Sequence, residues 1–144
     1  MIEILKLLLL NGEDYYSTPG QLNYMEEYLN DNESIFLVIN CDGVGMKDSP
    51  TAISFMELNR EKEELVKGMA LKRDGIDVIE PWVQGDHMLF VMNGIPAITF
   101  TSKEILKLID VIAHTEKDSL DIIDHKEVLK IILFIDEIIK TLLN

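Results

Sequence analysis

The sequence predicts an α/β domain with a mostly parallel sheet and helices on both of its faces. Short apolar runs alternate along the chain with stretches in which apolar residues recur at helical spacing. This alternation is typical of parallel strands that are joined by helical crossovers. The first run, residues 4–10, is almost continuously apolar, which is the pattern of a strand buried on both faces.

The remaining strands are predicted from shorter runs of apolar and β-branched residues that end at turn-forming residues. The run at 35–39 is followed by Asn-Cys-Asp-Gly, a common turn composition. Three further strands are predicted at residues 51–56, 76–79 and 96–101.

Helices are predicted where apolar residues recur every three or four positions between these strands. Thr18 and Pro19 suit the cap and the first position of a helix that stops near residues 30–32. Asp124 is a candidate cap of the last helix, with Glu127 at the capping-box position and apolar residues continuing to Leu143. The other helices are expected at residues 58–72, 86–93 and 103–109.

Composition excludes several classes of function. The 144 residues suit one domain, and 47% hydrophobic residues are too many for a disordered chain. A net charge of −13 argues against a nucleic-acid partner or an anionic membrane surface. There is no convincing signal peptide, no membrane-spanning stretch and a single cysteine, so we expect a soluble cytoplasmic protein without an intrachain disulfide.

Polar, metal-competent side chains follow the predicted strands, where ligands bind in open α/β sheets. Glu13 and Asp14 follow the first strand, Asp42 follows the second, and His114 lies in a loop beyond the strand at 96–101. Two carboxylates and an imidazole are reasonable zinc ligands, and a further acid can serve as a general base. Acidic residues are abundant in this chain, so solvated turns and an ordinary loop histidine explain the same residues.

Four segments of the sequence raise the weight of the metal-site interpretation. The first two are Asn-Gly-Glu-Asp at 11–14 and Asn-Cys-Asp-Gly at 40–43. The others are Gly-Asp-His-Met-Leu-Phe at 85–90, continued by Gly-Ile-Pro-Ala at 94–97, and Ala-His-Thr-Glu-Lys-Asp at 113–118. In order and spacing, these segments resemble the motifs of the di-zinc aminopeptidase family (metallopeptidase family 28). The resemblance implies a zinc-exopeptidase-like (phosphorylase/hydrolase-like) fold, of which residues 1–144 form the C-terminal portion.

The same resemblance implies a role for each matching residue. Glu13 corresponds to the general base, Asp14 and His114 to ligands of one zinc ion, and Asp42 to a ligand of the other. Asp14 stands where glutamate is commoner, so its carboxylate reaches about one methylene less far. Asp118 and Asp86 are expected as supporting groups around these ligands. By contrast, His87 is expected to be a structural histidine packed beside Trp82 and Phe90.

Two further metal ligands of the family have no counterpart in this sequence. They are a histidine in a His-x-Asp motif and an aspartate that bridges the two ions, and both precede the acidic pair. The sequence therefore predicts a fold that lacks its N-terminal strands, with weak or no zinc binding and little or no peptidase activity for the chain alone.

Two functions are consistent with these observations. The first is a metal-dependent exopeptidase that hydrolyses a terminal peptide bond of a peptide or an amino-acid-derived substrate. The second is a non-catalytic, truncated fragment that forms a homodimer through its exposed first strand. A third alternative is an acyl-transfer or cyclisation enzyme, as in the glutaminyl cyclases of this fold.

Overall fold

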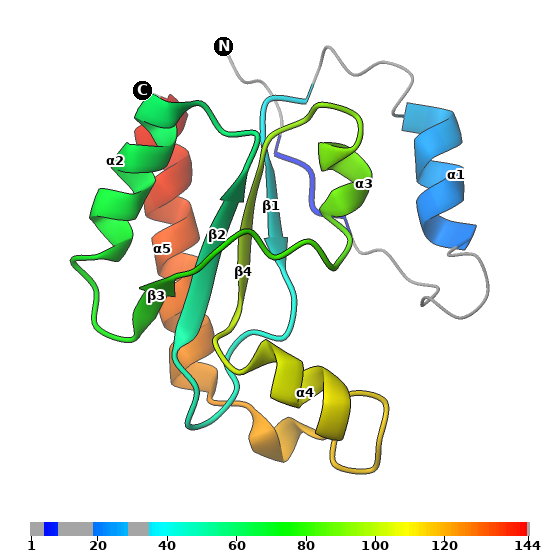
Figure 1. The fold of residues 1–144 in the computed structure, drawn as a ribbon, viewed down its shortest axis with the longest axis vertical. Coiled ribbons are helices and arrows are strands. Elements are labelled where there is room, and N and C mark those ends of the chain that lie inside the picture. Colours follow the sequence, from blue (N-terminus) through cyan, green and yellow to red (C-terminus); the bar gives the residue numbers. More distant parts are fainter. Residues whose placement is uncertain (1–4, 9–18, 29–34, 144) are drawn as a thin grey trace.

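The computed structural model describes residues 5–8, 19–28 and 35–143, and it confirms an α/β fold (Figure 1). An open sheet of four strands lies between helices on both sides. The elements in chain order are α1 (Pro19–Tyr28), β1 (Val38–Cys41), β2 (Thr51–Met56), α2 (Arg60–Ala70), β3 (Ile76–Val78), α3 (Met88–Val91), β4 (Ala97–Ser102), α4 (Ile105–Val111), the 3-10 helix η2 (Leu120–Ile122) and α5 (His125–Leu143).

The strand order is β1-β4-β2-β3, so the last strand is inserted between the first two. β4 runs parallel to β1, with Val38 opposite Ala97, and β2 runs parallel to β3. The pairing of β2 with β4 is antiparallel and places Thr51 opposite Ser102. The carboxyl ends of β1 and β4 therefore lie at the same end of the sheet as the amino ends of β2 and β3.

One face of the sheet is apolar and is covered by α2 and α5 (Figure 1). Ile98 and Phe100 of β4 point into this layer, where the Phe100 ring meets the Phe134 ring of α5 edge to face at 5.9 Å. The guanidinium group of Arg73 lies 4.2 Å from the centre of the Phe134 ring and closes the layer from the solvent side. This cluster is the main hydrophobic core of the described chain.

The opposite face is more polar, and it is covered by α1 and α3 (Figure 1). Because successive side chains of a strand alternate between faces, Thr99 points away from the core formed by Ile98 and Phe100. The Thr99 and Ser54 hydroxyl groups are both buried and lie 2.5 Å apart. His87, which precedes α3, is fully buried beside Trp82, as the sequence predicted, with ring centroids 5.5 Å apart.

Two of the helices, α2 and α5, begin at residues whose side chains cap them. The Asn59 side chain accepts a hydrogen bond of 2.9 Å from the backbone N–H of Lys62 at the start of α2. The Asp124 carboxylate accepts a bond of 2.8 Å from the backbone N–H of Lys126, which confirms Asp124 as a cap of α5. Both helices were predicted within two residues of their observed ends.

The prediction of a buried strand over residues 4–10 is wrong for the part that the structure describes. Residues 5–8 belong to no strand, and Leu5 and Leu7 are 80% and 89% exposed. An apolar run favours burial, but apolarity does not determine which strand of a sheet the run pairs with. The second strand is also displaced, because pairing with β4 begins only at Val38 and residues 35–37 precede the sheet.

Truncation of Phe134 tests the position of the core. Phe134 is 1% exposed, and Phe134→Ala is expected to lower the free energy of unfolding by about 3–5 kcal/mol, because a buried ring and its contacts are lost. The neighbouring Leu133 is 60% exposed, so Leu133→Ala is a matched control that should change it by about 0.5 kcal/mol or less. Urea unfolding followed by circular dichroism measures both. Equal losses in the two variants would contradict this packing.

A second prediction concerns stability in mild acid. Burial is the main cause that lowers the pKa of His87, so the folded state disfavours its protonation. As the pH falls below about 6.5, the unfolded chain takes up the proton first. The free energy of unfolding should therefore be highest above that pH and fall through the window between the unfolded and folded pKa.

Unfolding measured from about pH 7.5 to about pH 5.5 should show this loss in the native chain. His87→Gln should flatten that part of the profile, whatever its effect on stability at neutral pH. His125→Gln, at an exposed histidine, is the matched control. An unchanged profile in His87→Gln would show that another group causes the loss.

Candidate functional site

Asp42 stands at the end of β1, where the two parallel strands β1 and β4 both finish. Its backbone N–H donates to the carbonyl oxygen of Phe100 at 3.0 Å, which continues the ladder by one residue beyond the strand. Asp42 is exposed at this end of the sheet. This is the position at which open α/β sheets bind their ligands.

The turn after Asp42 is held against α4. Gly43 has a φ of 64°, and a Cβ atom there would lie 3.0 Å from side-chain carbons of Ile105 and Leu108. The Ser102 hydroxyl donates to the carbonyl oxygen of Gly43 at 2.5 Å. Glycine is therefore required by both the backbone conformation and the close approach of α4, and the position of Asp42 is linked to the position of that helix.

His114 follows α4 and is exposed, in the loop that leads to η2. Its φ of 60° lies in the left-handed region, which is uncommon for a residue with a side chain. The backbone N–H of His114 donates to the Asp118 carboxylate at 3.3 Å. Asp118 therefore contacts the main chain of His114, while an effect on the imidazole stays a prediction.

Asp86 and His87 connect α1 and β1 to the segment before α3. The Asp86 carboxylate accepts a hydrogen bond from the Gln21 amide of α1. The His87 Nε2 atom lies 2.7 Å from the carbonyl oxygen of Trp82, and its Nδ1 atom lies 3.3 Å from the amide nitrogen of Asn40. Asp86 thus contacts α1, and its predicted role as a support of the metal ligands stays a prediction.

The contact between Asn40 and His87 was not predicted from the sequence. Asn40 lies two residues before Asp42, so its side chain points to the same face of the sheet. The only sequence signal for Asn40 was its spacing from Asp42 in the Asn-x-Asp motif. No local pattern links Asn40 to His87, which lies 47 positions later.

Two buried polar atoms on this side of the described chain lack a hydrogen-bond partner, the Trp82 indole nitrogen and the Thr101 hydroxyl.

Cys41 lies beside Asp42, but its thiol is poorly suited to bind a metal ion. Desolvation of the thiol, together with the charge of the neighbouring Asp42 carboxylate, raises the pKa of Cys41 to about 11. The thiol is therefore protonated at neutral pH in the metal-free chain, and it is the thiolate that binds metals.

The described residues do not by themselves make a complete zinc site. Glu13 and Asp14 lie outside the residues that the structure describes. Within residues 5–8, 19–28 and 35–143, no group of three or more His, Cys, Asp or Glu side chains could hold a metal ion. The structure brings Asp42 and the His114 loop to one end of the sheet, and two exposed groups are fewer than the three protein ligands of a catalytic zinc.

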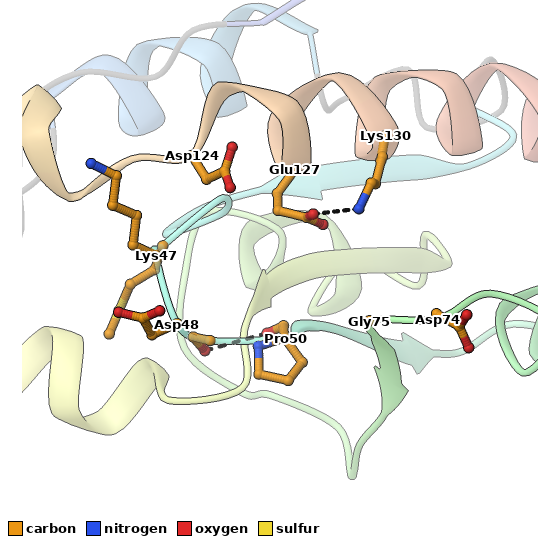
Figure 2. Close-up of a pocket in the computed structure, with 10 residues that line it drawn as sticks. Lys47, Asp48, Pro50, Asp74, Gly75, Asp124, Glu127 and Lys130 are labelled. Carbon is orange, nitrogen blue, oxygen red and sulfur yellow. Dashed lines mark hydrogen bonds and ion pairs between the residues drawn. The ribbon is translucent and has the colours of Figure 1, made fainter.

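A hollow of about 380 Å³ lies at the same end of the sheet, over the amino ends of β2, β3 and α5 (Figure 2). Both lysines that line it have partners: Lys47 donates to the carbonyl oxygen of Asp121 at 2.5 Å, and Lys130 pairs with Glu127. None of the residues expected to bind metal lines it. Its walls are Met46, Lys47, Asp48, Ser49, Pro50, Asp74, Gly75, Asp124, Glu127 and Lys130.

No helix of the described residues is long and apolar enough to cross a membrane. Neither curated proteins nor solved structures gave a match to the chain. A family model does match, and it covers residues 4–138, which include all four motifs and the whole described sheet. Since that match spans most of the 144 residues, the chain belongs to peptidase family M28.

Proposed function

We propose that the chain forms part of a metal-dependent exopeptidase site that hydrolyses a terminal peptide bond. The observation that carries the proposal is the position of Asp42 at the carboxyl end of β1 in a chain of peptidase family M28. Asp42 is exposed there, and α4 packs on the adjacent glycine before the chain continues to His114. This arrangement supports a ligand pair at the carboxyl ends of the parallel strands.

The roles proposed for the individual residues follow the family resemblance. Glu13 is the general base, Asp14 and His114 bind one zinc ion, and Asp42 binds the other. Asp118 and Asp86 support these groups. A bound zinc ion polarises the scissile carbonyl and activates a water molecule, and the substrate class is a peptide or an amino-acid derivative.

The 144 residues alone are proposed to bind zinc weakly and to have little or no peptidase activity. None of the three histidines in the sequence is followed two positions later by an aspartate, so the His-x-Asp motif has no match in it. That leaves two proposed ligands for one ion and one for the other, whereas a catalytic zinc usually has three.

Zinc titration followed by ¹H–¹⁵N NMR tests the site, because it detects weak binding residue by residue. Zinc is expected to shift the resonances around Asp42 and His114, and Asp42→Asn should weaken this binding at least about tenfold. Asp110→Asn, at an exposed position of α4, is the matched control and should bind as the native chain does. No shift at Asp42 or His114 in millimolar zinc would overturn the ligand assignment, and tight binding of two ions would contradict the expected weakness.

A second candidate function is self-association through the first apolar segment. Leu5 and Leu7 are largely exposed, and β1 pairs only with β4 among the described residues, so one edge of β1 is open to another strand. Exposed apolar segments and open strand edges favour pairing with a second copy of the chain.

Sedimentation velocity tests this candidate over a range of protein concentrations. We expect a concentration-dependent dimer that is lost in Leu7→Glu, because a buried charge at the interface is costly. Leu71→Glu is the matched control, since Leu71 is 74% exposed and lies beyond α2. A native chain that stays monomeric at all concentrations would exclude this function.

A further inference from the structure

His87 is buried on the polar face of the sheet and interacts with two different segments. Its Nε2 atom is 2.7 Å from the carbonyl oxygen of Trp82, and its Nδ1 atom is 3.3 Å from the amide nitrogen of Asn40. The Trp82 ring packs against the imidazole of His87. The imidazole therefore has a contact on its ring face as well as one at each nitrogen.

These contacts determine the tautomer of the imidazole. A carbonyl oxygen can only accept, so the Nε2 atom must carry the proton and donate it to Trp82. The Nδ1 atom then has a free lone pair, which accepts from the amide of Asn40. A proton on Nδ1 would face that amide N–H, and burial independently lowers the pKa of His87.

The same contacts exclude His87 as a metal ligand. A ligating imidazole needs one unprotonated nitrogen directed at the ion. In His87 the protonated nitrogen is bound to Trp82, and the unprotonated one is directed at Asn40. Any effect of His87 on the candidate site must therefore be transmitted through another residue.

Asn40 connects His87 to the end of β1. Its backbone pairs with Thr99 of β4, and its side chain projects to the same face as that of Asp42, two residues later. The Asp42 N–H is bonded to the carbonyl oxygen of Phe100, so the main chain here already belongs to the ladder. The hydrogen bond between Asn40 and His87 therefore acts on β1 two residues before Asp42.

We propose that His87, as the Nε2–H tautomer, is a positioning residue that holds Asn40 and thereby orients Asp42 at the end of β1. The purpose of this orientation, which is to present Asp42 as a metal ligand, rests on the proposed function. The contacts themselves exist in the chain without any metal.

Two substitutions of His87 test the hydrogen bonds of the two imidazole nitrogens separately. In His87→Asn the amide oxygen takes the place of Nδ1 and can still accept from Asn40. In His87→Gln the amide nitrogen takes the place of Nε2 and can still donate to Trp82. Each variant loses one hydrogen bond and some ring packing, so a merely structural role predicts similar effects for both.

The experiment uses NMR on the metal-free chain. Imidazole ¹⁵N shifts of the native protein should show a protonated Nε2 and an unprotonated Nδ1, a readout that needs no variant. Hydrogen exchange at the Asp42 amide should then be at least about tenfold faster in His87→Gln than in His87→Asn. A proton on Nδ1, or equal exchange at Asp42 in the two variants, would overturn the proposal.

A zinc titration of the same samples separates this proposal from the proposed function. If the exchange result holds but zinc shifts no resonance at Asp42, the positioning role stands and the metal-site function fails. If exchange at Asp42 is equal in the two variants but zinc shifts the Asp42 resonance, the function stands and the positioning role fails.

Discussion

The pairing of β4 with strands on both of its sides is the interaction on which the rest of the structure depends. β4 is buried along its whole length, parallel to β1 and antiparallel to β2. Because β2 begins where β4 ends, the turn after β1, the start of α4 and the start of α5 all gather at one end of the sheet. Asp42 and the loop of His114 lie at this end because β4 occupies the central position.

β4 also divides the domain into two chemically different halves. Its apolar side chains complete the core with α5, whereas its threonines face a layer that contains Ser54, His87 and Asn40. Buried polar groups are stable only when they are hydrogen-bonded, so this second layer depends on specific partners rather than on volume alone. The candidate site lies at the edge of that polar layer, where orientation of side chains matters more than tight packing.

Sequence patterns predicted the local elements better than their arrangement. β2 was predicted with its observed ends because its run of β-branched and apolar residues is bounded by Pro50 and Glu57 on both sides. The insertion of β4 between β1 and β2 was not predicted, since strand order depends on long-range pairing that leaves no local pattern. Residues 5–8 show the same limit, because their apolarity says nothing about which partner would cover them.

The candidate site was predictable to the extent that its residues lie in short motifs. Asp42 was predicted as a metal ligand because it follows the apolar run at 35–39. His114 was predicted because it lies in a loop beyond the strand at 96–101. The hydrogen bond between His87 and Asn40 was not predicted, because it joins residues from different motifs. Each of the two is an ordinary polar residue within its own segment. His87 was correctly judged structural from its apolar neighbours, but its partners required the fold.

The central place of β4 also constrains the order in which this sheet can form. β1 and β2 precede β4 by some forty or more residues, so a chain emerging from the ribosome carries both strands without the partner that joins them. Contacts between residues so distant in sequence form slowly, because a long loop must close before any of them is made. Ile39 and Phe55 can reach their full set of core contacts only after the second half of the chain has been made, because β4 and α5 supply the other part of that core.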